Sequence, residues 1–247
     1  MQPHKVEGWI NTPVKDEVKF AAEVAEICSV YHSAFDAYKE GRHVISTDEK
    51  TGIQALERII LPARQGSCEK QEVTYKRHGT QCLIANFEIA TGKIVSSTIG
   101  DTRTEKDFTA HIQQTIAADP SGDWTFVMDN LNTHRAESLV KLVTHHCGLS
   151  ESLGEKGVSG VLKNMESRSA FLSNPAHRIR FVYTPKHASW LNQIEIWFSI
   201  LVKRLLKRLS VKSTDELKDK IEAFIIFFNK TMAKPFKWTY KGKVLSA

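Results

Sequence analysis

With 247 residues, 41% of them apolar, the chain is long enough to bury the core of one large domain. Its four cysteines form no C-x-x-C pair and no apolar run approaches a membrane span, which argues against a disulfide-stapled secreted domain and against a membrane protein. The net charge of +6 is concentrated between Lys203 and Lys243, which fits either a solvated basic face or a surface for a polyanion such as nucleic acid.

The first half of the chain predicts one helix followed by strands. Apolar spacing through 14–31 indicates an amphipathic helix, and 43–54 begins as a strand. Residues 80–100 predict two strands joined as a hairpin at Thr91-Gly92. The basic segment 55–79 between these strands is longer than a hairpin connection needs, so we expect it to reach out from the sheet and contact DNA or a second protomer.

The second half alternates helices with short apolar strands. Its predicted elements are a helix at 104–119, a strand at 123–130, a helix at 134–147, an inserted polar excursion at about 148–177, a strand at 178–185, and helices at 189–209 and 214–232. A hairpin-rich start followed by βαβ crossovers predicts an α/β fold, with a mixed five-stranded sheet and helices on both faces.

Three carboxylates stand out against this pattern. Asp48 and Asp129 each lie at or near the end of an apolar strand, where aspartate is disfavoured. Glu195 lies in the apolar stretch SWLNQIEIWF, on a narrow polar stripe that it shares with Asn192 and Lys203. An isolated strand-end aspartate can be a turn former, and a lone helical glutamate can face solvent. In open α/β sheets, however, sites form beyond the carboxyl ends of the strands, so the three side chains are expected to converge.

Convergence of three carboxylates requires a compensating charge, since like charges raise one another's pKa. Magnesium takes oxygen ligands and keeps positions for water and phosphate, and a pair of such ions can clamp an in-line phosphoryl displacement. On this interpretation Glu195 is buried because a metal neutralises it. Asp129→Asn is expected to abolish cleavage and to raise the melting temperature without metal, because one like charge is removed.

Three sequence blocks resemble those of a DDE transposase, in the bacterial insertion-sequence branch of the Tc/mariner superfamily. The blocks are STDEKTGIQALER, VMDNLNTH and TPKHASWLNQIEIWFSIL, and the stretches YKRHGTQCLIANFEIATGK and MAKPFKWTYKGK are similar to that family too. The resemblance covers about residues 40–243. It implies an RNase H-like fold, a catalytic and metal-binding triad of Asp48, Asp129 and Glu195, and two Mg²⁺ or Mn²⁺ ions per site.

The same resemblance implies an activity and a setting. Water activated at the metal site would cleave a phosphodiester at the transposon end, and the released 3′-OH would attack target DNA, in cut-and-paste movement into TA targets. The implied partners are double-stranded DNA, as terminal inverted repeats and target, a second copy of the chain in a homodimer, and a separate helix-turn-helix polypeptide. A cytoplasmic, nucleoid-associated protein of a bacterium is expected.

The sequence departs from this family in two ways. Glu195 follows Asp129 by 66 positions, more than is usual, and the excursion at 148–177 accounts for most of the excess. Family members begin with helix-turn-helix modules. In this chain, only the stretch QPHKVEGWI resembles the end of such a module. We therefore expect a linker helix in 1–40 that follows a missing DNA-binding region, a catalytic domain in 41–234, and a basic tail in 235–247.

Residues beside the triad are weighed individually. Asn130 and Asn192 are predicted to support the carboxylates, whereas His134 is interpreted as structural. Glu49 is expected on the sheet face opposite to Asp48, because neighbouring strand residues alternate. Ser189 is predicted to cap the last catalytic helix, and the tryptophans of that helix are predicted to pack in the core. The candidate DNA contacts are Arg64, Lys70, Lys76, Arg77, Lys186, His187, Lys203 and Lys207.

Two classes of function remain open. The first is a metal-dependent DNA phosphoryltransferase, which the intact set of carboxylates favours. The second is a non-catalytic nucleic-acid-binding remnant of a transposase, with the fold and the basic surface but no turnover.

Overall fold

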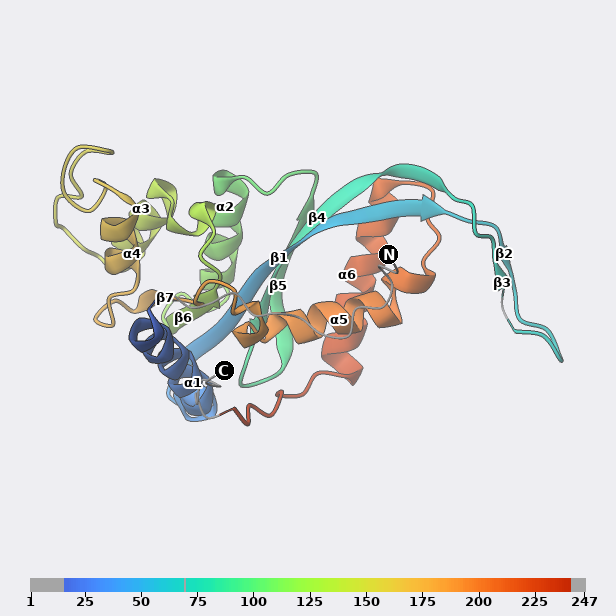
Figure 1. The fold of residues 1–247 in the computed structure, drawn as a ribbon, viewed down its shortest axis with the longest axis horizontal. Helices are drawn as coiled ribbons and strands as arrows, with labels where there is room; N and C mark the ends of the chain where they lie inside the picture. Colours follow the sequence, from blue (N-terminus) through green and yellow to red (C-terminus); the bar gives the residue numbers. More distant parts are fainter. Residues whose placement is uncertain (1–15, 69, 241–247) are drawn as a thin grey trace.

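The computed structural model describes residues 16–68 and 70–240. Its centre is a five-stranded sheet in the order β5-β4-β1-β6-β7 (Figure 1). The strands are β1 (Arg42–Glu57), β4 (Lys76–Glu88), β5 (Lys93–Gly100), β6 (Asp123–Met128) and β7 (Ile179–Tyr183). β5, β4 and β1 pair antiparallel, whereas β1, β6 and β7 pair parallel. The sheet is therefore mixed, as the hairpin followed by crossovers predicts.

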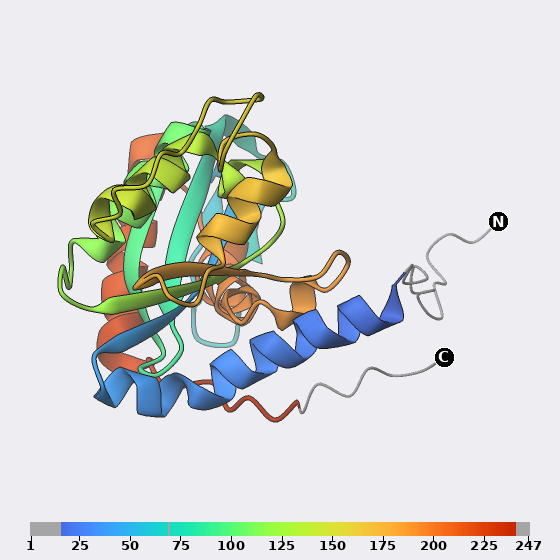
Figure 2. The same cartoon turned by 90° about the vertical axis from the view of Figure 1, so that its left-hand side faces the viewer.

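Helices cover both faces of this sheet (Figure 2). The α-helices are α1 (Glu17–Lys39), α2 (Glu105–Ile116), α3 (Glu137–His146), α4 (Met165–Leu172), α5 (Ile194–Arg204) and α6 (Thr214–Thr231). One core cluster joins α1, α5 and α6 to Val44 and its face of the sheet, and a second joins α2, α3 and α4 to Ile45 and the other face. Alternation along β1 thus sends successive side chains to opposite helix layers.

Two predicted helices are interrupted in the structure. The helix expected at 134–147 is a 3₁₀ turn, η1 (Asn132–Arg135), followed by α3. The helix expected at 189–209 is divided into η2 (Ser189–Leu191), α5 and η3 (Leu206–Arg208). Ser189 consequently opens η2 and does not cap α5, whose N-cap is Gln193 without a side-chain cap bond. Helical periodicity detects neither break, because the apolar spacing continues across them.

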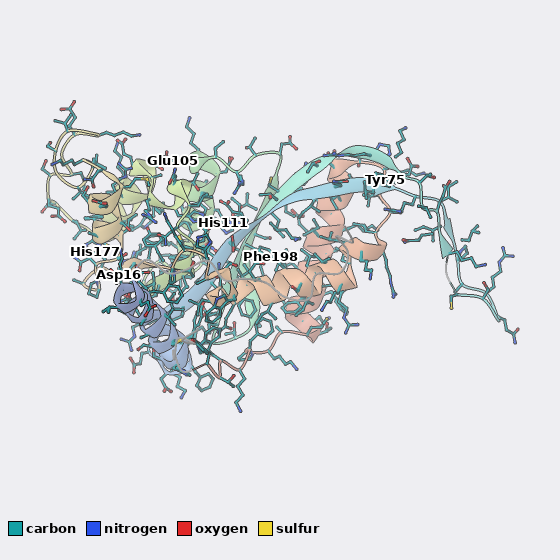
Figure 3. All side chains as sticks on the ribbon, in the orientation of Figure 1. Asp16, Tyr75, Glu105, His111, His177 and Phe198 are labelled. Carbon is teal, nitrogen blue, oxygen red and sulfur yellow. The ribbon has the colours of Figure 1, made fainter. Side chains whose placement is uncertain are left out.

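The connection between β1 and β4 reaches out from the sheet, as predicted. It contains the short strands β2 (Ile60–Leu61) and β3 (Lys70–Gln71), which pair antiparallel. Together with the first two residues of β4 this connection forms a projecting arm, defined here as residues 58–68 and 70–77 (Figure 1). Tyr75 belongs to this arm and lies far from Phe198 and His111, which face the two sides of the central sheet (Figure 3).

Both ends of the described chain pack onto the domain. The inward face of α1 contributes Ile27 and Tyr31 to the core beside β1. Past α6 the chain crosses the β4–β5 turn at Gly92, where a Cβ would lie 2.0 Å from the Lys234 carbonyl oxygen, and so only glycine fits. Trp238 then packs on Tyr31 with ring centroids 4.9 Å apart. The division into linker helix, catalytic domain and tail stays a prediction.

Candidate active site

Two of the predicted carboxylates follow neighbouring parallel strands. β1 and β6 pair with Ser46 beside Val127, and continuing this register by two residues sets Asp48 beside Asp129. Both positions lie at the carboxyl ends of the paired segments, because β1 diverges from β6 beyond this point and continues only with β4. The site thus forms where an open α/β sheet exposes its strand ends.

Asn192 ties the start of α5 to β1. Its buried amide donates from Nδ2 to the Thr47 carbonyl oxygen at 2.9 Å and to Asp48 Oδ2 at 3.0 Å, and its Oδ1 accepts from the Ser46 hydroxyl. Ser46 Oγ in turn accepts from the Ile194 backbone N–H at 2.9 Å. These contacts hold the first turn of α5, and with it Glu195, against the end of the strand that carries Asp48.

Burial raises the pKa of Asp48 to about 6, and the like charges of Asp129 and Glu195 add to this rise. The charges of Asp129 and Glu195 therefore act on Asp48. Glu195 itself is exposed in the first turn of α5, so the expectation that it is buried is wrong.

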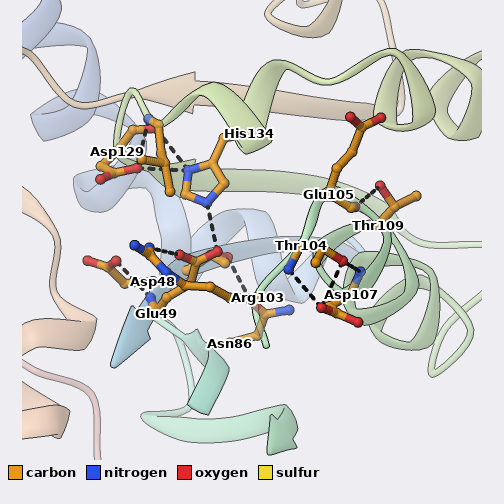
Figure 4. Close-up of polar contacts among 12 residues, drawn as sticks. Asp48, Glu49, Asn86, Arg103, Thr104, Glu105, Asp107, Thr109, Asp129 and His134 are labelled. Atoms are coloured by element: carbon orange, nitrogen blue, oxygen red, sulfur yellow. Dashed lines mark hydrogen bonds and ion pairs between the residues drawn. The ribbon is translucent and has the colours of Figure 1, made fainter. Parts of the chain in front are cut away.

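Asp129 is held on the other side by a histidine. His134 Nδ1 lies 2.8 Å from Asp129 Oδ1, and His134 Nε2 lies 3.4 Å from Glu49 Oε1, which in turn pairs with Arg103 at 2.7 Å (Figure 4). Burial opposes the charged imidazole, but the hydrogen bonds to Asp129 and Glu49 raise the pKa of His134 to about 9. Burial likewise opposes ionised Asp129, yet the bond and charge of His134 lower its pKa.

This arrangement alters the expected effect of Asp129→Asn on stability. Asp129 is stabilised by His134 and carries a lowered pKa, whereas Asp48 is the carboxylate whose charge is unfavourable. Removing the charge of Asp129 would break its ion pair with His134, whose side chain is only 1% exposed. The structure therefore assigns the relief of repulsion to Asp48 and not to Asp129.

A hollow of about 180 Å³ opens beside Glu195. Lys50 and Lys203 flank the glutamate there, with Phe198, Ser199 and Val202 as the remaining lining. Lys50 follows Asp48 by two residues, so alternation sends it to the same face, where its Nζ lies 5.9 Å from the Phe198 ring centroid. The two ammonium groups give this hollow a positive charge that suits a phosphate.

The candidate DNA contacts fall into three exposed groups. Arg64, Lys70, Lys76 and Arg77 lie on the arm, away from the carboxylates. Lys186 and His187 lie in the loop that leads from β7 to η2, where His187 adopts the left-handed φ of 63°. Lys203 and Lys207 lie at the end of α5 and in η3. Of these residues, Lys203 reaches the hollow beside Glu195.

Other predictions about neighbouring residues have mixed outcomes. Asn130 donates to the Thr184 carbonyl oxygen at 2.5 Å and accepts from Arg135, so it joins β6 to β7. Glu49 does lie on the face opposite to Asp48, toward α2. Trp197 is buried as predicted, but Trp190 is 53% exposed and packs against Tyr240, because η2 precedes the break that starts α5.

Sequence reasoning missed Lys50 and Arg103. The period of two along β1 carries the signal for Lys50, since it places this lysine on the side of Asp48. No local pattern indicates Arg103, which lies in the connection before α2 and reaches Glu49 across 54 positions of sequence.

The donor set suits a hard divalent cation, since three carboxylates with a raised pKa among them favour a compensating charge. In residues 16–68 and 70–240, however, no three His, Cys, Asp or Glu side chains are already gathered around one ion position. Holding an ion would therefore require these side chains to close further.

Comparison with known proteins gives a family and a fold. The model of a family described as DDE superfamily endonuclease matches residues 43–218. No curated protein matches the sequence. Solved structures of the Mos1 mariner transposase are similar in fold. A paired-end complex with Mn has 12% identity and a TM-score of 0.53, and a pre-cleavage transpososome has 11% and 0.54.

These two matches cover 90% of this chain, which spans 59% of the length of the Mos1 chains. The isolated catalytic domain of Mos1 has 9% identity and a TM-score of 0.52, over 88% of this chain and 85% of that domain. The similarity confirms the predicted RNase H-like α/β fold. Among the described residues, no helix is long and apolar enough to cross a bilayer.

Proposed function

Because the chain belongs to the DDE superfamily endonucleases, we propose that it is the catalytic part of a transposase that cleaves and joins DNA strands with divalent metal. Asp48, Asp129 and Glu195 would hold two Mg²⁺ or Mn²⁺ ions, with Asn192 in support of Asp48. When bound, such ions stabilise charge on the attacking and leaving oxygens of an in-line displacement. The fold shared with Mos1 transposase structures, two of them transposon-end DNA complexes, supports this assignment.

Two phosphoryl displacements make up the proposed reaction. In cleavage, a water oxygen bonds to phosphorus while the P–O3′ bond breaks, and the departing oxygen takes up a proton to leave a 3′-OH. In strand transfer, that 3′-OH gives up its proton as its oxygen bonds to a target phosphorus, while a target P–O3′ bond breaks and the departing oxygen takes up a proton. The chain contributes Asn192, which orients Asp48, and His134, which orients Asp129. Lys50 and Lys203 would bind the phosphate beside Glu195.

One observation carries the proposal. The pKa of Asp48 is raised to about 6 by burial and by the charges of the other two carboxylates. These residues lie 81 and 147 positions away in sequence and come from separate elements. A buried carboxylate whose pKa is raised in part by two neighbouring carboxylates is typical of a site that binds a cation.

A cleavage assay tests the assignment. The full chain would be incubated with duplex DNA carrying the terminal repeats that flank its own coding sequence, with Mg²⁺, Mn²⁺ or EDTA. We expect metal-dependent nicking that Asp129→Asn abolishes. Cleavage by Asp129→Asn at the rate of the unaltered chain would contradict the triad. Metal-independent DNA binding without nicking by the unaltered chain would instead support the non-catalytic remnant.

DNA contact is proposed for the three exposed basic groups described above, and a homodimer is proposed because the arm projects beyond the domain that carries it. The arm presents Val73 and Tyr75 to solvent beside its cations, with the Arg58 guanidinium 5.0 Å from the Tyr75 ring centroid. Sedimentation of the chain with and without terminal-repeat DNA tests the dimer, which would be excluded by a single protomer on each duplex.

A further inference from the structure

A line of alternating charges crosses β1 to reach Asp129. Arg103 donates to Glu49 Oε2 at 2.7 Å, Glu49 Oε1 lies 3.4 Å from His134 Nε2, and His134 Nδ1 lies 2.8 Å from Asp129 Oδ1 (Figure 4). We call Arg103, Glu49 and His134 the relay. The side chains of Glu49 and His134 are 2% and 1% exposed, so their charges are compensated by one another and not by water.

The relay constrains the histidine at both ring nitrogens. Each nitrogen faces a carboxylate oxygen, which can only accept, so both carry a proton that they donate. The ring is fixed from the side as well, because the Phe108 ring centroid lies 4.2 Å away. A histidine held in this way cannot rotate without leaving Glu49 unpaired in the interior.

The consequence for Asp129 is a fixed carboxylate with one free oxygen. The Leu131 backbone N–H donates to Oδ1 at 3.0 Å. His134 Nδ1 forms its ion pair with the same oxygen at 2.8 Å and also lies 3.2 Å from the Asp129 backbone carbonyl oxygen. No donor from residues 16–68 and 70–240 is placed on Oδ2. The hydrogen bond and the ion pair at Oδ1 set the rotation of the carboxylate, so that Oδ2 is the oxygen left to face the site.

We propose that Arg103 and Glu49 are positioning residues that act through His134 to present Asp129 Oδ2 to a divalent cation. This inference rests on the proposed function, in which Asp129 is a metal ligand. It extends the site to the opposite face of the sheet, because Glu49 projects toward α2 while Asp48 projects toward α5. Partners of this kind, behind a metal ligand, commonly change metal affinity by about 10–100-fold when they are altered.

Metal titration of the full chain without DNA tests the relay. Isothermal titration with Mn²⁺ would compare the unaltered chain with Glu49→Gln, Arg103→Ala and Arg103→Lys. Glu49→Gln keeps the side-chain volume but removes the charge that holds His134. We expect it to weaken Mn²⁺ binding by about 10-fold or more, and Arg103→Ala by a smaller factor that Arg103→Lys largely restores. Circular dichroism would show that each variant is folded at the titration temperature.

Lys106→Ala is the matched control for Arg103→Ala, since it removes the same charge from an exposed residue three positions along. It is expected to bind Mn²⁺ as the unaltered chain does. A merely structural relay would lower the melting temperature of the Glu49 and Arg103 variants and leave Mn²⁺ affinity of the folded protein within twofold, which would overturn the inference. Asp129→Asn separates the two proposals. If it abolishes Mn²⁺ binding while Glu49→Gln does not change it, only the relay fails, and if Asp129→Asn binds normally, the proposed metal site fails.

Discussion

Asn192→Ala tests how α5 is attached to the sheet. The substitution removes two bonds donated to Thr47 and Asp48, at 2.9 and 3.0 Å, and one accepted from the Ser46 hydroxyl. A neutral hydrogen bond contributes about 1 kcal/mol and one to a carboxylate about 1.5–3 kcal/mol, so the loss sums to about 4 kcal/mol. In a domain of this size each kcal/mol shifts Tm by about 2–4 °C, which predicts a decrease of about 8–16 °C.

The same substitution should impair cleavage in the protein that remains folded. Glu195 lies in the first turn of α5, and displacement of a reacting group by about 1 Å can cost about 100-fold in rate. Thermal unfolding followed by circular dichroism gives the first quantity, and single-turnover cleavage at a temperature where the variant is folded gives the second.

Asn229→Ala provides the matched control. Asn229 likewise joins two elements through its amide, accepting from the Ile94 N–H at 2.9 Å and donating to the Ile94 carbonyl oxygen at 2.8 Å, but it lies on α6 away from the carboxylates. It should lose stability and keep its cleavage rate. The reasoning is refuted if Asn192→Ala cleaves as fast as Asn229→Ala.

Further predictions concern charge and pH. Asp48→Asn should raise the free energy of unfolding of the metal-free chain above pH 6, by at most about 3 kcal/mol. The pKa of Asp48 is raised from 3.8 to about 6, so ionisation of this side chain costs stability as pH rises through that window. Urea unfolding at pH 4 and pH 8 checks this, and an equal effect at both pH values would contradict it. The pKa of His43 is raised, chiefly by its hydrogen bond to Glu88. The stabilisation from this pair is therefore complete below about pH 6.5 and is lost as pH rises through the higher pKa of the folded state. His43→Gln should destabilise the fold more at pH 5.5 than at pH 9, and the reverse order in urea unfolding would exclude this contribution. Replacing the four basic arm residues with alanine should flatten the salt dependence of DNA affinity without changing Mn²⁺ binding; these residues are Arg64, Lys70, Lys76 and Arg77. Fluorescence anisotropy at several salt concentrations measures this dependence, and an unchanged slope of affinity against salt would assign DNA contact to α5 and η3.

The layered fold was accessible from the sequence because local rules govern it. Alternation along β1 assigns Val44 and Ile45 to opposite faces, and both are buried in separate clusters. The Thr91-Gly92 turn and the apolar run that ends at Met128 identify the hairpin and a parallel strand, and their order limits the sheet to a few topologies. The two aspartates could then be placed together at the carboxyl ends of parallel strands before any side chain was located.

Tertiary structure decided which charged residues are buried and which partner each of them meets. Periodicity places Glu195 on a polar stripe, but whether that stripe is buried depends on where α5 begins, and the Asn192 bridge to β1 across 145 positions sets that start. From the sequence, His134 is interpreted as a structural residue. The structure places Glu49 and Asp129 at its two ring nitrogens, 85 and 5 positions away along the chain. Such pairings depend on how the connecting segments bring separate elements together. Local propensity describes each element alone, so it contains no information on which buried charge meets which partner.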